Sequence, residues 1–188
     1  MVDNVMGRDA MHRVSTLRNY VAQMCCPPFF MKNLINSFDR QFAILHENSV
    51  SLVREIPLEK IYWQPFESGA LFPVNSCGEY ILRSAGAVEQ TFGGITVRLW
   101  DDPFEWTLPE KLSTNELILE YLQEVEETRR KGFAFFQTDE DLKREMPAPE
   151  KLKSIVQILL ETLARAENFQ GRALAIFKII KSGKTRFE

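Results

Sequence analysis

Histidine is scarce in this chain, which has only two, His12 and His46, among 188 residues. Cysteine is scarce too: the three are the adjacent Cys25 and Cys26 and a lone Cys77, which excludes a disulfide framework. The sequence also contains no phosphate-binding P-loop, no H-E-x-x-H zinc motif and no G-x-S-x-G nucleophile motif. Familiar nucleotide-binding, zinc-protease and serine-hydrolase chemistry is therefore not indicated.

Long apolar runs are missing as well. No run approaches the ~20 residues that a membrane-spanning helix needs, and no N-terminal stretch resembles a secretion signal. With so few cysteines, we expect a protein of the reducing cytoplasm that binds no membrane. The formal charge of −3 gives no general attraction to nucleic acid, and the basic residues of the last forty positions lack interleaved aromatic rings. We therefore expect no nucleic-acid partner.

What the chain does have is helical periodicity. Apolar residues recur every three or four positions, and no strand-like alternation of comparable length competes. The first stripe consists of Leu34, Phe38, Phe42, Leu45, Ser49, Leu52 and Ile56. Capping-box patterns at Ser76–Glu79 and Ser113–Glu116 mark two helix starts, and Gly93-Gly94 marks a helix end. The pattern predicts helices over residues 29–55, 76–92, 113–136 and 149–181, with short turns over 58–63 and 138–145.

The predicted fold class is therefore all-α, a four-helix bundle with connections of unequal length. Residues 1–28 form a short N-terminal helical arm in this prediction, because Pro27 and Pro28 interrupt any helix between it and the bundle. The bundle occupies residues 29–183, and residues 184–188 form a C-terminal tail.

Several motifs then carry a family resemblance. Trp63-Gln64-Pro65 precedes the second helix, which opens as Ser76-Cys-Gly-Glu79 and continues as Ile-Leu-Arg83-Ser-Ala-Gly86. The last helix contains Arg165-x-x-x-Phe169-Gln-Gly171-Arg. In order and spacing these motifs resemble the DinB/YfiT-like superfamily over residues 29–183. The resemblance implies a DinB-like four-helix bundle, commonly paired as a homodimer, in which three histidines bind a divalent metal.

The three positions that match those histidines hold other residues here. They are Arg83, Arg165 and Phe169. A guanidinium group keeps its proton and has no lone pair for a metal, and a phenyl ring has none either. Neither His12 nor His46 can rebuild a three-histidine site. We therefore expect a degenerate metal site that holds neither metal nor cofactor.

Two interpretations of the arginines stay open. In the first, Glu79 pairs with Arg83 and Glu161 with Arg165, since each carboxylate lies four residues before its arginine. In the second, the two cations take the place of one metal and form a positive pocket for a carboxylate, phosphate or sulfonate. Arg83, Arg165, Phe169, Glu79 and Glu161 are the candidate ligand-binding residues of that pocket.

The sequence accordingly favours a metal-free DinB-like protein that acts as an interaction module or binds a small ligand, with small anions as the candidates. The alternative is an enzyme, since the resemblance also implies thiol-transferase-like or hydrolytic activity. The missing ligands argue against the alternative.

Overall fold

The computed structural model describes residues 32–65, 75–102 and 109–182. The chain divides into two units, residues 1–31 and residues 32–188, and every described residue belongs to the second. The predicted arm at 1–28, the first residues of the predicted helix 29–55 and the predicted tail at 184–188 lie outside the described residues.

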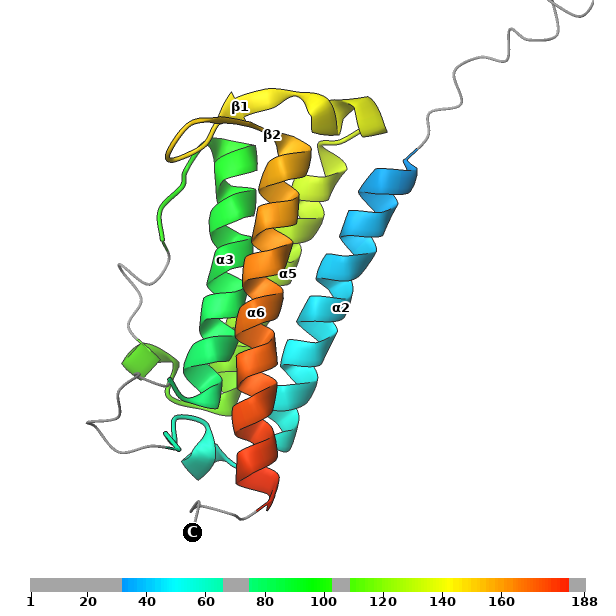
Figure 1. The fold of residues 1–188 in the computed structure, drawn as a ribbon. Coiled ribbons are helices and arrows are strands. Elements are labelled where there is room, and N and C mark those ends of the chain that lie inside the picture. Colours follow the sequence, from blue (N-terminus) through cyan, green and yellow to red (C-terminus); the bar gives the residue numbers. More distant parts are fainter. Residues whose placement is uncertain (1–31, 66–74, 103–108, 183–188) are drawn as a thin grey trace, which may run out of the picture. The chain divides into compact units, whose positions relative to one another are not determined.

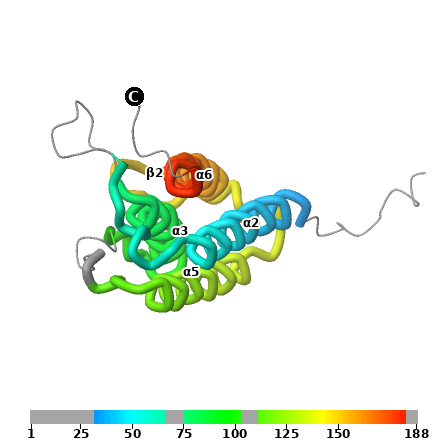
Figure 2. Tube along the Cα trace, turned by 90° about the horizontal axis from the view of Figure 1, so that it is seen from below, coloured from blue at the N-terminus to red at the C-terminus, as the bar shows by residue number. Residues whose placement is uncertain are grey.

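Four long helices make up the described part of the chain, so the predicted all-α four-helix bundle is confirmed (Figure 1). They are α2 (Asn33–Glu55), α3 (Cys77–Val97), α5 (Asn115–Ala134) and α6 (Ile155–Ser182). Viewed along the bundle, α6, α3, α5 and α2 follow one another around it (Figure 2). The shorter elements are η1 (Leu58–Lys60), η2 (Pro109–Leu112), η3 (Asp139–Lys143), β1 (Glu145–Pro147) and β2 (Leu152–Ser154). Among the described helices, none combines the length and apolar character needed to cross a membrane.

Phenylalanine rings fill the middle of the bundle. Phe42 of α2, Phe92 of α3 and Phe133 of α5 pack with ring centroids 5.1–5.9 Å apart. The predicted stripe of the first helix is buried as expected except at its start, where Ile35 faces the core and Leu34 is exposed. Large rings from three helices therefore form one continuous core.

Helices α3 and α6 run antiparallel and are joined along their contact line by small side chains. On α3 these residues recur every seven positions, the spacing that keeps one helix face against a partner. Three hydrogen bonds connect the helices: Cys77 Sγ to Ala173 O at 3.4 Å, Ser84 Oγ to Ala166 O at 2.9 Å, and Thr91 Oγ1 with Thr162 Oγ1 at 2.7 Å. We call these six residues the seam. Because its side chains are small, the two backbones approach closely.

The start of α2 is capped from a distant part of the chain. Lys32, at the N-cap position, makes no side-chain cap. Instead the two carboxylate oxygens of Asp139 in η3 accept hydrogen bonds from Leu34 N and Ile35 N, each at 3.0 Å. An anion at a helix N-terminus also favours the helix dipole. This contact holds η3 against the N-terminal end of α2.

Helix α3 begins as predicted and ends later than predicted. Ser76 and Glu79 form the expected capping box, but the helix passes through Gly93-Gly94 to Val97. The residue that caps this end is Arg98, whose φ of 59° is left-handed. The glycine at 94 serves packing, because a Cβ there would overlap the ring of Trp100.

Two other boundaries also differ from the prediction. Helix α5 is capped by Thr114, whose hydroxyl accepts from Leu117 N, and not by Ser113. Helix α6 begins at Ile155 and not near Pro149, because residues 145–154 form the antiparallel hairpin β1–β2. Each strand of this hairpin has three residues, which is too short to produce a recognisable alternating pattern in the sequence. In Figure 1 the hairpin lies across the end of the bundle where α3 ends and α6 begins.

Two helical glycines provide a matched test of this packing. A Cβ at Gly132 of α5 would overlap the buried ring of Phe92, whereas a Cβ at Gly171 of α6 meets nothing. Gly171→Ala should therefore stabilise the protein by about 0.5–1 kcal/mol through helix propensity, and Gly132→Ala should destabilise it by about 1–3 kcal/mol through overpacking. Urea unfolding of both variants measures the difference. Changes of the same sign in both would contradict the packing described here.

Candidate functional site

Several of the candidate site residues lie directly beside the seam. Arg83 and Gln90 each directly precede a seam residue on α3, and Glu161 and Arg165 each precede one on α6. In antiparallel helices, positions that precede the contact residues lie on the same flank. The side chains of both helices therefore meet along one side of the α3–α6 contact. Gln90 lies seven residues after Arg83, a signal that the sequence contained.

A hollow on this flank brings together three of the predicted site residues. Its volume is about 110 Å³, and its lining consists of Arg83, Gly86, Ala87, Gln90, Asp102, Arg165 and Phe169. We call it the small hollow. The small side chains at 86 and 87 leave the space. Two guanidinium groups against one carboxylate give the lining a net charge of +1. Both arginines are exposed, so the pair lies at the surface and not inside the bundle.

Gln90 holds Arg165 in place. Its side-chain nitrogen donates to Trp100 O at 2.9 Å, and its side-chain oxygen accepts from Arg165 Nη2 at 3.0 Å. The first contact sets the orientation of the amide, so its oxygen faces the guanidinium. An amide oxygen is a neutral acceptor and a weaker partner for arginine than a carboxylate.

The two predicted carboxylate–arginine pairs are replaced by other contacts. Glu79 accepts from Ser76 N at 2.7 Å in the capping box. Glu161 pairs with Lys153 at 2.7 Å and accepts from Gln157 at 2.8 Å. These hydrogen bonds, that from Lys153 first, lower the pKa of Glu161. In the described part of the chain, no ion pair joins either arginine to a carboxylate.

A second hollow, which we call the large hollow, lies beside the first. Its volume is about 340 Å³, and it lies between α3, α6 and residues 148–150 of the hairpin turn. The buried hydroxyls of Thr91 and Thr162 belong to its lining, together with Trp100 and Ile158. Sequence patterns could not reveal this hollow, because it depends on the hairpin and on where Trp100 packs.

The donor set of the small hollow does not fit a metal ion. Among the described residues of its lining, two arginines, a phenylalanine and a glutamine offer no imidazole or thiolate, and Asp102 is the single carboxylate. Across the described residues, no group of three or more histidine, cysteine or acidic side chains is placed to hold a metal. The chemistry of this site is therefore that of arginine.

Cys77 is not placed to act as a nucleophile. It is buried in the seam, where its thiol donates to Ala173 O. Burial raises the pKa of this thiol to about 12. The reactive thiolate form is therefore negligible near neutral pH.

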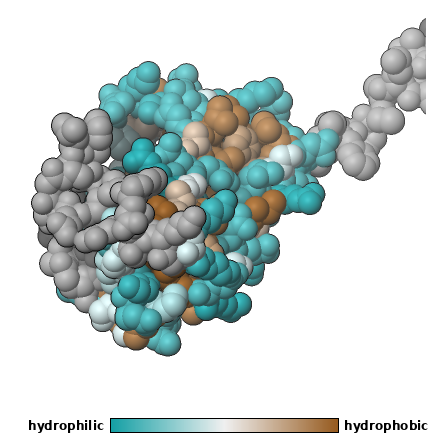
Figure 3. Space-filling model, turned by 60° about the horizontal axis from the view of Figure 1, so that its bottom comes forward, coloured by the Kyte–Doolittle hydropathy of each residue, from teal (hydrophilic) through white to brown (hydrophobic). Residues whose placement is uncertain are grey.

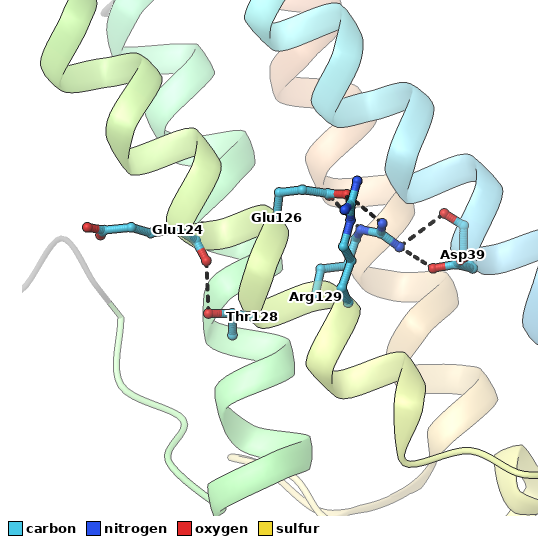
Figure 4. Close-up of polar contacts among 6 residues, drawn as sticks. Asp39, Glu124, Glu126, Thr128 and Arg129 are labelled. Atoms are coloured by element: carbon cyan, nitrogen blue, oxygen red, sulfur yellow. Dashed lines mark hydrogen bonds and ion pairs between the residues drawn. The ribbon is translucent and has the colours of Figure 1, made fainter.

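A separate charged cluster lies between α5 and α2 (Figure 4). Glu126 and Arg129 are only 3% and 4% exposed and are joined by two hydrogen bonds of 2.7 Å. Arg129 also binds the side chain and the carbonyl of Asp39 on α2, and Arg130 binds Glu126 from the solvent side. Burial acts to raise the pKa of Glu126, but the hydrogen bonds from both arginines outweigh it and lower that pKa.

Sequence reasoning missed this cluster, although a signal existed. Glu126 lies four residues after Leu122, and Arg129 lies four residues before Phe133, so both fall on the apolar face of α5. Breaking such a pair leaves a buried charge and costs about 3–5 kcal/mol. The cluster therefore holds α5 against α2.

His46 borders the same cluster. Together with Glu126, Arg129, Ser49 and Ser84 it lines a small pocket of about 20 Å³, enough for one water molecule. Burial is the main cause that lowers the pKa of His46, and Arg129 and Arg130 lower it further, while Glu126 and Glu47 act to raise it. The neutral imidazole is therefore the form that suits the folded state.

No family model, curated protein or solved structure matches this chain. The resemblance to the DinB/YfiT-like superfamily therefore stays a prediction from motifs.

The lowered pKa of His46 predicts a loss of stability in mild acid. As the pH is lowered through 6.5, the ordinary pKa of histidine, the unfolded chain takes up a proton before the folded protein does. The free energy of unfolding therefore decreases as the pH is lowered, until the pH reaches the pKa of His46 in the folded protein. For one group the slope cannot exceed about 1.4 kcal/mol per pH unit. Urea unfolding between pH 7.5 and 5.5 should show this loss, and His46→Gln should reduce it. His12→Gln, which removes the other histidine, is the control. Equal reductions in both variants would contradict the assignment to His46.

Proposed function

We propose that this protein is a metal-free binding module whose α3–α6 groove takes a small anionic ligand. The observation that supports this is the meeting of two exposed guanidinium groups from different helices in one hollow. Among the described residues, Arg83 has no carboxylate partner, and the hydrogen-bond acceptor of Arg165 is the amide oxygen of Gln90. A carboxylate, phosphate or sulfonate would supply the charged partner that both arginines are suited to bind.

Exposure of the arginines makes such binding reversible at modest cost. A solvated guanidinium needs no permanent buried partner, so it can exchange water for a ligand. Phe169 adds an apolar edge to the site, with its ring stacked on Tyr80 at a centroid distance of 6.4 Å. Among the described residues the enzyme alternative has no comparable support, because no group of side chains there is placed to hold a metal and burial keeps Cys77 in its thiol form.

Opposite charge changes in the small hollow test this proposal. Arg83→Gln should weaken the binding of inorganic phosphate or acetate about tenfold, since it removes a charged hydrogen-bond donor. Asp102→Asn should strengthen binding about two- to fivefold, because it removes a surface anion from the same lining. Titration calorimetry at low salt measures both. If the two variants bind these anions as the wild type does, or if the wild type binds neither anion, the small hollow is not an anion site.

We also propose that the module self-associates through the outer face of α6. Figure 3 shows apolar side chains gathered in patches on one face of a mostly hydrophilic surface. Leu160 and Leu174 of α6 are 59% and 40% exposed, and their separation of fourteen residues places them within about 40° on the helix. Paired helices would remove these leucines from water.

A charge substitution on this face tests self-association. Leu160→Glu should shift the protein from dimer to monomer in sedimentation equilibrium, because a carboxylate would have to be buried in the interface. Leu152→Glu on β2 is the matched control, since Leu152 is 62% exposed and lies on the hairpin. A monomeric wild type, or a dimer that survives Leu160→Glu, would refute this interface.

A further inference from the structure

We infer that the ligand of this groove is a monoanion with an apolar body, whose acid group lies at Arg83 and Arg165 and whose body occupies the large hollow. This inference rests on the proposed function and names the class of molecule that the site takes. It follows from how the two hollows connect, from the size of the second one and from the hydrogen bonds of its floor.

The two hollows meet at one pair of side chains. Gln90 and Arg165 belong to the lining of both, and the hydrogen bond between them marks the boundary. An anion bound at Arg83 and Arg165 therefore lies next to the entrance of the large hollow. A ligand carboxylate is also a stronger partner for Arg165 than the Gln90 amide is. Any chain attached to that anion can extend past Gln90 along the same flank.

The sizes of the hollows favour a ligand larger than a simple anion. The small hollow of about 110 Å³ suits one acid group, whereas the large hollow of about 340 Å³ falls within the range of small-molecule sites. Its apolar surfaces are Trp100, Ile158, Ala148 and Pro149. One side of the Trp100 ring packs so closely on Gly94 that a Cβ would overlap it, so the ring is held in position beside the hollow.

The floor of the large hollow disfavours a second anionic group. Thr162 Oγ1 donates its single proton to Ile158 O at 2.8 Å. In the 2.7 Å contact between the two hydroxyls, Thr91 must therefore be the donor. Both protons are used, so this buried pair can accept a hydrogen bond but cannot donate one. A carboxylate on this floor would lie against oxygen lone pairs.

The charged residues at the rim of the large hollow also disfavour a second anionic group. Lys153 is already paired with Glu161 at 2.7 Å, and Glu150 belongs to the same lining. Within the described part of the large hollow, Arg165 is therefore the remaining cation, and it belongs to the acid group of the ligand. One acid end and an uncharged body fit this distribution.

Trp100 provides a reporter for the large hollow alone, because it does not belong to the lining of the small one. The 188-residue chain carrying Trp63→Phe and Trp106→Phe retains Trp100 as its only tryptophan. Acetate, hexanoate and adipate are then titrated. Hexanoate should bind about tenfold more tightly than acetate, through burial of its methylene groups, and should change Trp100 fluorescence. Adipate, with a carboxylate at each end, should bind about tenfold more weakly than hexanoate.

Two variants assign the parts of the ligand. Ala148→Phe, which fills the large hollow, should abolish the preference for hexanoate and keep acetate binding, whereas Arg83→Gln should weaken both. Arg83-dependent acetate binding without any gain from the longer chain would overturn this inference and leave the proposed function intact. A hexanoate preference that survives Ala148→Phe, or adipate binding as tight as hexanoate, would also overturn it. If no carboxylate or phosphate binds, the proposed function fails as well.

Discussion

The close contact between α3 and α6 is the constraint on which the rest of this structure depends. The side chains of the seam are short enough for the two backbones to approach closely. Their hydroxyl and thiol groups form hydrogen bonds between the helices, and two of the three bonds go to carbonyl oxygens of α6. Apolar residues of similar size would pack there but would leave no directional contact. Each of the three bonds also favours a single alignment of the two antiparallel helices. That alignment decides which side chains meet on the flanks, including Arg83 and Arg165.

The opposite side of the bundle is held together differently. There α2 and α5 meet through the rings of Phe42 and Phe133 and through the Glu126–Arg129 pair that extends to Asp39. A buried ion pair is weak evidence for stability, because desolvation offsets much of the attraction. Its clearer effect is on specificity, since any sliding of α5 along α2 would separate Arg129 from Asp39. Neutral hydrogen bonds therefore set the alignment of α3 with α6, and charged hydrogen bonds set the alignment of α5 with α2.

The sequence predicted the helices well and the site only in part. Periodicity and the Ser76 capping box were sufficient for the all-α bundle, because both are local signals. The cap that Asp139 provides for α2 and the contact of Trp100 with Gly94 join residues that local patterns do not relate. The sequence therefore did not predict the cap and placed the end of α3 too early. For the site, the family resemblance implied that Arg83, Arg165 and Phe169 lie together, and one hollow does contain all three. Spacing also suggested partners, Glu79 and Glu161, that the structure engages elsewhere.

The position of the arginines beside the seam, and not within it, explains why charge is tolerated there. A residue on the contact line would face the small side chains of the partner helix, where a guanidinium would be desolvated without a counter-ion. One position earlier on each helix, the same group reaches the surface while its Cα stays close to the other helix. Two cations can then approach each other from separate helices without burial, and water screens their repulsion until an anion replaces it. A metal site needs converging lone pairs in a fixed geometry, whereas this flank offers converging hydrogen-bond donors, and the chemistry of the groove follows from that difference.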